Sequence, residues 1–108
     1  MNKDIVFEKE TITQDIPADK PHTYWFNGYN LSDKIITRLT FESSCSCTVS
    51  NPPKLMNPKE RFQFEIIFDP QGNSGYYAKS VKFKLDNGQE IRLRINGKII
   101  EQEKQENK

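Results

Sequence analysis

Apolar and polar residues alternate with a period of two along four stretches of the chain, and each such stretch predicts a β-strand. The clearest is 61–68, and the same alternation covers 35–41, 77–85 and 90–99. In 35–41 the alternation places on one face Ile35, Thr37, Leu39 and Phe41. Successive side chains of a strand point to opposite faces, so each stretch is expected to bury one face and expose the other to water.

Shorter and less regular segments complete the predicted sheet structure. The aromatic stretch 22–29 is ambiguous in phase, while 5–7 and 11–13 have the length of edge strands. The prolines fall between the alternating stretches, where they do not interrupt a sheet: Pro17, Pro21, Pro52, Pro53, Pro58 and Pro70. About seven short antiparallel strands without a convincing helix predict an all-β protein with an Ig-like β-sandwich fold.

The connection 86–88 determines the register of the last predicted hairpin. A two-residue turn would pair Phe83 with Arg92 and would mix the buried and exposed faces. A three-residue loop with Gly88 in the left-handed conformation pairs Phe83 with Ile91 instead. Burial of one face specifies register strongly, so we predict the three-residue loop.

The composition supports one domain with a lean core. Only 34% of the 108 residues are hydrophobic, and isoleucine and phenylalanine together outnumber leucine by eighteen to five, which favours strands over helices. We expect a single Ig-like domain over 1–100 and a mobile charged tail over 101–108.

Charge, hydropathy and the lack of catalytic motifs exclude several classes of protein. The formal net charge is +1, so no overall field favours nucleic acid, and no apolar run approaches the roughly 18 residues of a membrane span. The first ten residues lack the apolar segment of a secretory signal, so we expect a location in the cytoplasm or in a virion assembled there. Common nucleophile, metallopeptidase and nucleotide-binding motifs are missing from the sequence, so we expect neither an enzyme nor a cofactor.

An ordered series of short motifs adds a family resemblance to this pattern. The motifs are, in chain order, Phe26 and Asn30, S-C-S-C-T at 44–48, P-K-E at 58–60, F-D at 68–69, G-Y-Y-A-K at 75–79 and L-R-I-N-G at 93–97. The series resembles a bacterial family of uncharacterised Ig-like domains with an S-C-G-C-T motif, related in architecture to major sperm protein and ASH domains. The resemblance spans roughly Ile5 to Ile99. It implies an Ig-like sandwich without an established catalytic activity.

Two positions differ from the motifs of that family. Ser46 and Lys59 stand where the family has glycine. A type II turn needs a positive φ at its third residue, so we do not expect that turn type at Lys59.

Cys45 and Cys47 are the one pair of reactive side chains close together in the sequence. In an extended strand their Cα atoms would lie roughly 6.6 Å apart, near the upper limit for a disulfide, so a bond between them would be strained and easily reduced. As a zinc site the pair is two ligands short of four, even though His22 is available as a third. We favour a role in which one thiol packs as a small apolar side chain and the other is incidental, and thiol redox chemistry or metal binding is the alternative.

Further side chains are candidates for contact with a partner. The outer face of the last hairpin carries Lys82, Lys84, Arg92 and Arg94. This basic face is typical of a solvated edge that resists aggregation, and its alternative role is to dock an acidic partner. Trp25 is expected in the core, as in many sandwiches, whereas exposure would suggest an interface. Tyr76 follows a glycine-rich loop, a common position for contacts.

The sequence therefore predicts a non-enzymatic module that acts through protein–protein contacts. Its expected partners are proteins, including further copies of the chain or a larger particle such as a phage virion that it would help to assemble or decorate. The candidate surfaces are the region 43–58, the loop 72–75 and free sheet edges. The alternatives are a thiol redox or metal-binding function of Cys45 and Cys47, and weak nucleic-acid binding by the basic hairpin.

Overall fold

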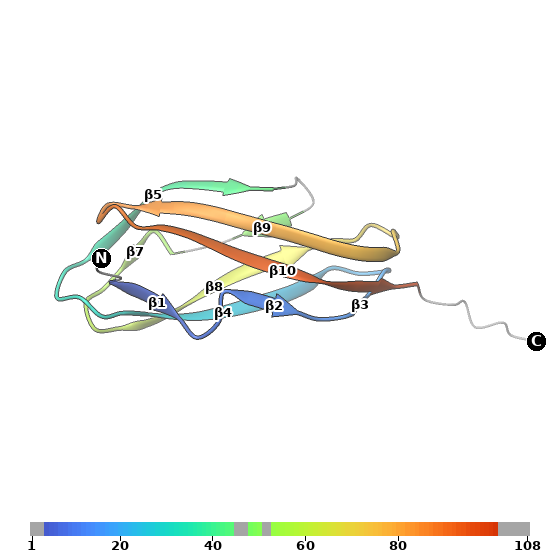
Figure 1. The fold of residues 1–108 in the computed structure, drawn as a ribbon, viewed down its shortest axis with the longest axis horizontal. Helices are drawn as coiled ribbons and strands as arrows, with labels where there is room; N and C mark the ends of the chain where they lie inside the picture. Colours follow the sequence, from blue (N-terminus) through green and yellow to red (C-terminus); the bar gives the residue numbers. More distant parts are fainter. Residues whose placement is uncertain (1–3, 45–47, 51–52, 102–108) are drawn as a thin grey trace, which may run out of the picture.

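The computed structural model describes residues 4–44, 48–50 and 53–101, and their strands form two sheets packed face to face (Figure 1). In spatial order, the first sheet consists of β1 (Ile5–Phe7), β4 (His22–Asn30), β8 (Arg61–Phe68) and β6 (Thr48–Ser50). The second consists of β2 (Thr11–Thr13), β10 (Glu90–Ile100), β9 (Gly75–Leu85), β5 (Ile36–Ser43) and β7 (Leu55–Met56), with β3 (Ile16–Pro17) also paired to β10. The all-β sandwich predicted from the alternation is confirmed.

The core lies between the two sheets and is built from the faces that the alternation predicts for β8, β9 and β10. Phe64 of the first sheet and Phe83 of the second are fully buried, and their ring centroids lie 4.6 Å apart. Burial of one such side chain contributes about 1.5–3 kcal/mol, so a few well-placed rings compensate for the low apolar content of the chain.

The β9–β10 hairpin has the predicted register. Phe83 pairs with Ile91, and Lys84 pairs with Glu90. Gly88 has a φ of 91°, and its N–H donates to the Leu85 carbonyl at 3.0 Å, which closes the three-residue loop. The one-sided burial of these strands thus selects the register, as the alternation indicated.

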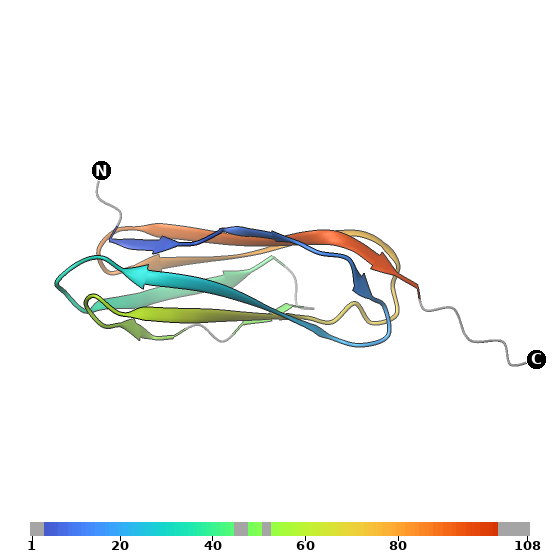
Figure 2. The ribbon, with the colours of Figure 1, turned by 90° about the horizontal axis from the view of Figure 1, so that it is seen from below.

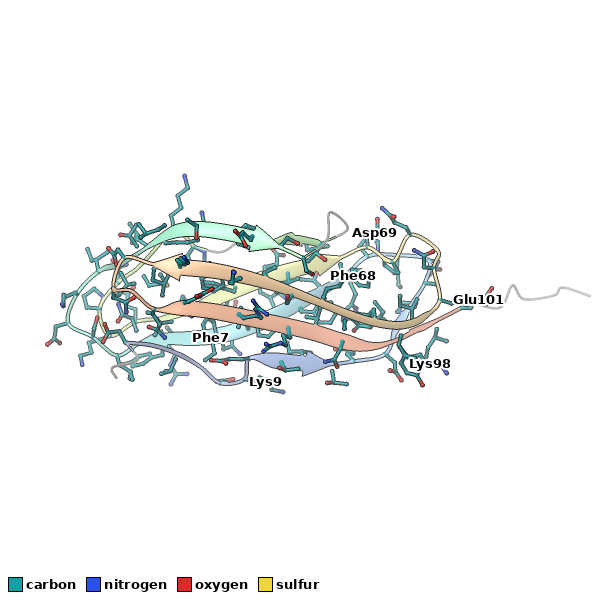
Figure 3. The ribbon with its side chains drawn as sticks, turned by 45° about the horizontal axis from the view of Figure 1, so that its top comes forward. Phe7, Lys9, Phe68, Asp69, Lys98 and Glu101 are labelled. Atoms are coloured by element: carbon teal, nitrogen blue, oxygen red, sulfur yellow. The ribbon has the colours of Figure 1, made fainter. Side chains whose placement is uncertain are left out.

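The N-terminal segment crosses from the first sheet to the second along one side of the sandwich (Figure 2). Phe7 ends β1, which is antiparallel to β4, and Lys9 lies in the crossover (Figure 3). β2 and β3 then pair in parallel with β10. The described residues therefore contain ten strands rather than about seven, two of them parallel to their neighbour, because short edge segments pair as well. Pro17, expected in a connection, ends β3 opposite Ile100.

A close approach of two backbones at Gly97 fixes the position of this N-terminal segment. Between β2 and β3 the Gln14 N–H donates to the Asn96 carbonyl at 2.8 Å. Gly97 has a φ of 150°, and a Cβ at this position would overlap the Gln14 carbonyl oxygen. Only glycine allows the segment to lie this close to β10.

The predicted phase of 35–41 is right for Phe41, which packs against the core, and wrong for Ile35 and Leu39. Ile36 is buried, whereas Ile35 and Leu39 are exposed. The register of β5 against β9 shifts between Arg38 and Thr40, which is a β-bulge. A bulge inserts one extra residue and reverses the facing of the residues beyond it, so the alternation continues in sequence but not in space.

The expected burial of Trp25 is also wrong. Its neighbours Tyr24 and Phe26 point into the core, and strict alternation along β4 places Trp25 on the outer face, where it is half exposed. Its cross-strand partner is Glu65 of β8. The core therefore takes its aromatic content from tyrosine and phenylalanine.

The expectation against a positive φ at Lys59 is wrong as well, since its φ is 60°. The Lys59 N–H donates to the Asn30 carbonyl at 2.9 Å, and its Nζ donates to the Leu31 carbonyl at 2.7 Å. The left-handed conformation costs roughly 1–2 kcal/mol for such a residue, and these two hydrogen bonds offset it.

The predicted tail, 101–108, falls outside the described residues except for Glu101, and the domain boundary at 100 stays a prediction. No helix long and apolar enough to cross a membrane occurs in 4–44, 48–50 or 53–101.

Candidate protein-interaction surface

The β-bulge in β5 creates an aliphatic surface at the edge of the second sheet. Leu39 is 63% exposed, Ile35 54% and Leu55 50%. Leu55 of β7 pairs with Thr37 of β5, so it lies diagonally between Ile35 and Leu39. We call these three side chains the β5–β7 patch. In Figure 1, β5 is labelled at the top of the molecule and β7 below it, near the same end.

A buried asparagine holds the two segments that carry the patch. Asn30 is fully buried, and its Nδ2 donates to the Lys34 carbonyl at 2.9 Å and to the Met56 carbonyl at 3.0 Å. Lys34 directly precedes Ile35, and Met56 directly follows Leu55. Asn30 therefore fixes the spacing of the patch from within the core.

The acceptor side of the same amide is also satisfied. The Asn30 Oδ1 accepts hydrogen bonds from the Ser32 N–H at 2.9 Å and from the Ser32 Oγ at 2.8 Å. A buried amide with all of these bonds made is rigid, because any rotation would leave polar atoms unpaired. Asn30 is one of the motif residues in the family resemblance, but the sequence did not reveal its role.

Basic residues neighbour the β5–β7 patch in the chain or across the strands. Lys34 and Lys54 are exposed and stand next to Ile35 and Leu55 in the chain. Lys84 of β9 pairs with Thr40, the residue after Leu39, so it lies beside the bulge. None of these three lysines forms an ion pair with another described residue.

The predicted basic face continues from Lys84 over β9 and β10. Arg92 pairs with Lys82 and Arg94 with Ser80, and both arginines are exposed. The like charges of Lys82 and Arg92 are opposite each other in the hairpin, and two carboxylates relieve their repulsion, since the Lys82 Nζ lies 3.4 Å from Glu90 and 3.7 Å from Glu42. Lys82 thus forms ion pairs, whereas Lys84, Arg92 and Arg94 form none with the described residues.

The other two predicted contact residues lie elsewhere on the molecule. Tyr76 is 86% exposed but pairs with Lys98, at the opposite end of β9 from Lys84. Eight residues of strand separate Tyr76 from Lys84, roughly 26 Å. Trp25 lies on the outer face of the first sheet. The structure therefore places Lys84 beside the patch and Arg92 and Arg94 two strands away on β10, and it leaves Tyr76 and Trp25 elsewhere.

Cys45 and Cys47 lie outside the described residues, so the redox and metal hypotheses stay predictions. The ring of His22, the proposed third ligand, packs edge-on against Tyr24 with centroids 4.8 Å apart. Among the described residues, no three His, Cys, Asp or Glu side chains are grouped as metal ligands would be.

Two tyrosines show the chemically unusual environment of the core. The hydroxyls of Tyr24 and Tyr77 lie 2.6 Å apart, and the Tyr77 hydroxyl donates to the Gln14 carbonyl at 2.6 Å. Burial raises the pKa of both side chains above the ordinary value of tyrosine. Both hydroxyls are buried and hydrogen-bonded within the protein, so their arrangement serves the fold rather than a substrate.

A groove over β1, β4 and β8 is lined in part by side-chain amides. Its amides bond to one another: Gln63 Nε2 donates to Asn27 Oδ1 at 2.9 Å, and Asn27 Nδ2 donates to Glu8 Oε1 at 3.3 Å. Beneath it, the rings of Phe7 and Phe62 lie 5.7 Å apart and fill the space over Gly28. Glu8, Asn27 and Gln63 are thus bonded to one another across the strands.

Residues 5–99 match the family described as "Protein of unknown function (DUF1573)", the same span over which the motifs suggested a resemblance. An S-C-G-C-T motif and a bacterial membership of that family stay expectations. No curated protein matches the sequence.

Solved structures share the fold at low sequence identity. The human ASH/PapD-like domain of CEP192 is 14% identical with a TM-score of 0.78, and the match covers 95% of this chain and 92% of that one. A protein of unknown function from Porphyromonas gingivalis W83 is 10% identical with a TM-score of 0.76, covering 88% and 46%. The periplasmic chaperone SfaE is 15% identical with a TM-score of 0.59, covering 88% and 56%. This chain spans about half of the latter two. The likeness confirms the Ig-like fold alone.

Proposed function

We propose that this chain, which belongs to the DUF1573 family, is a non-enzymatic Ig-like module that binds another protein through the β5–β7 patch. The observation that carries the proposal is the exposure of three aliphatic side chains, Ile35, Leu39 and Leu55, at one edge of the second sheet. Contiguous exposed aliphatic side chains lower solubility and are costly to keep in water unless a partner covers them.

The surroundings of the patch agree with an interface. Apolar interface centres are typically bordered by polar and charged side chains, and here the border consists of Lys34, Lys54 and Lys84. The PapD-like and ASH-like folds of the structural relatives are compatible with an interaction module. As a setting we propose assembly into, or decoration of, a larger particle such as a phage virion.

Weak nucleic-acid binding by the basic face is a less favoured role. Lys82 is held by Glu42 and Glu90, so only three cations of this face, Lys84, Arg92 and Arg94, have no ion pair among the described residues, too few for a long phosphate backbone. Phosphate backbones bind to surfaces with clustered unpaired cations, and their binding falls steeply with salt.

Site-specific photo-crosslinking in the cell of origin tests the proposal. A photoreactive amino acid replaces Leu39 in the patch or, as the control, Thr11, which is exposed on β2 at the other edge of the same sheet. We expect one discrete adduct from position 39 and none from position 11. Equal labelling from both positions, or no adduct from position 39, contradicts the proposal.

A further inference from the structure

We infer that the β5–β7 patch and the basic residues beside it receive an extended, acidic segment of another protein, in which aliphatic side chains alternate with carboxylates. This inference rests on the proposed function and names the chemistry of the partner. Three observations support the inference: the exposed side chains of the patch, the cations near it and the small number of unpaired carboxylates nearby.

The patch fits side chains from one face of an extended chain. Ile35 directly precedes β5 and Leu39 lies four residues further on, at most roughly 13 Å along extended chain, and Leu55 on β7 is opposite Thr37, between them. Residues two apart in an extended peptide point the same way at intervals of roughly 6.6 Å. Alternate aliphatic residues of such a peptide therefore match the length of the patch, and the intervening residues point away from it or to its borders.

The borders of the patch attract carboxylates. Lys84 lies beside the bulge, and Arg92 and Arg94 extend the positive surface across β10. Glu42 and Glu90, the acidic residues on this face, are both paired with Lys82. An acidic segment thus meets cations that have no ion pair among the described residues, with limited competition from the protein's own carboxylates.

One more acidic side chain near the patch is engaged by the fold itself. Asp86 Oδ1 accepts a hydrogen bond from the Thr37 N–H at 3.1 Å, and the Asp86 N–H donates to the Thr37 carbonyl at 2.9 Å. Asp86 therefore ties the hairpin loop to β5 and helps to keep the patch rigid. A preorganised surface loses less entropy when it binds.

The same charges disfavour a second copy of this chain as the occupant. A two-fold contact centred on the patch would bring Lys34, Lys54 and Lys84 of one copy close to the same residues of the other. Like charges facing each other across an interface cost binding free energy, so the border that attracts an acidic segment repels a copy.

Binding of a synthetic peptide to the full chain tests the inference. The probe is a short peptide in which glutamate alternates with leucine, and fluorescence anisotropy measures its affinity at low and physiological salt. Two control peptides replace glutamate by lysine or leucine by serine. We expect binding of the first peptide alone, weakened by salt.

Matched substitutions locate the site. Leu39→Ser should lower the affinity at least about tenfold, whereas Tyr76→Ser, which removes an exposed side chain at the far end of the sheet, should change it by less than about twofold. Lys84→Glu should weaken binding at least about threefold, and Lys98→Glu, the same charge change on the same face, should not. Circular dichroism of each variant confirms the fold.

Several outcomes overturn the inference. These are equal binding of the lysine–leucine peptide, equal effects of Lys84→Glu and Lys98→Glu, equal competition by duplex DNA, formation of a dimer through the patch, or no binding of the acidic peptide. A photo-crosslinked adduct at position 39 without peptide binding would leave the proposed function standing and would reject only the acidic partner. Failure of both experiments rejects both.

Discussion

The hydroxyl oxygens of Tyr24 and Tyr77 lie 2.6 Å apart in the core and join the two sheets. Because the Tyr77 proton is already donated to the Gln14 carbonyl, the Tyr24 hydroxyl is the donor to Tyr77. The resulting chain links β4, β9 and the bend between β2 and β3. It therefore fixes both the sheet packing and the N-terminal segment.

Replacing the two tyrosines by phenylalanine should give unequal losses of stability. Tyr24→Phe removes one donor and should cost about 1 kcal/mol, while Tyr77→Phe leaves the Gln14 carbonyl and the Tyr24 hydroxyl both unpaired and should cost about 2–3 kcal/mol. The double variant leaves only the carbonyl unpaired, so it should be no less stable than Tyr77→Phe. Urea unfolding measures all three. Additive losses would contradict the chain of hydrogen bonds.

Alkaline pH should destabilise the protein through the same pair. Burial raises the pKa of Tyr24 and Tyr77, whereas the unfolded side chains ionise near their ordinary value of about 10. Above that pH the unfolded state releases protons that the folded state retains, so the stability present below pH 10 falls as the pH rises. The fall should be smaller in the Tyr24→Phe/Tyr77→Phe variant. Thermal unfolding between about pH 8 and 11 measures it, and parallel curves would reject the assignment.

Removal of the Asn30 amide, or its replacement by a carboxylate, should lower the stability of the fold. Its Nδ2 donates to two carbonyl oxygens, those of Lys34 and Met56. Asn30→Ala should cost about 2–4 kcal/mol because both acceptors lose their donor in the core.

Asn30→Asp adds a dependence on pH to this loss. A carboxylate facing two carbonyl oxygens is destabilised, so its pKa should lie above the usual value of about 4, and the variant should lose stability as the pH rises from about 4 towards neutrality. Denaturant unfolding at acid and neutral pH tests this. A deficit relative to the native chain that is equal at both values would show that the introduced carboxylate has found another partner.

Gly97 should be the least replaceable of the glycines with a positive φ. Gly97→Ala should cost about 3 kcal/mol or more, because the new methyl group would overlap the Gln14 carbonyl and displace the segment between β2 and β3. Gly72→Ala is the matched control, since Gly72 also has a positive φ but has open space around it, and it should cost about 1 kcal/mol. Hydrogen exchange of β2 and β3 should rise only in the first variant. Similar effects of both substitutions would reject the role of the close approach.

The sequence predicts those elements in which one face is continuously buried. β8, β9 and β10 follow strict alternation, and the charged residues between their apolar positions leave one choice of face, which also determines the β9–β10 register. The same reasoning fails for β5, because Leu39 occupies a bulge and a bulge has no signature in the alternation of residue types. The β5–β7 patch was therefore hidden by the very pattern that predicted the strand.

The positions of the basic residues were predictable from the sequence, but the ion pairs that they form were not. Lys84, Arg92 and Arg94 follow from the outward positions of a hairpin whose register the sequence determines. The neutralisation of Lys82 requires Glu42, which lies on β5 and comes beside β9 only through the long-range order of the strands. Likewise, the role of Asn30 depends on two carbonyls from segments that only the fold brings together.

Trp25 offers a direct test of the outward face of β4. Its indole is half exposed and pairs across the strands with Glu65, whereas Phe26, the next residue, is fully buried. Trp25→Ser should cost less than about 1 kcal/mol, while Phe26→Ala should cost about 3–5 kcal/mol because it leaves a cavity in the core. As the chain contains one tryptophan, its fluorescence reports on this position alone. Iodide should quench the emission of the folded protein, since the ion reaches exposed indoles but not buried ones. Emission that iodide quenches only after the protein unfolds would show that Trp25 is buried, and it would reverse the assignment of the two faces of β4.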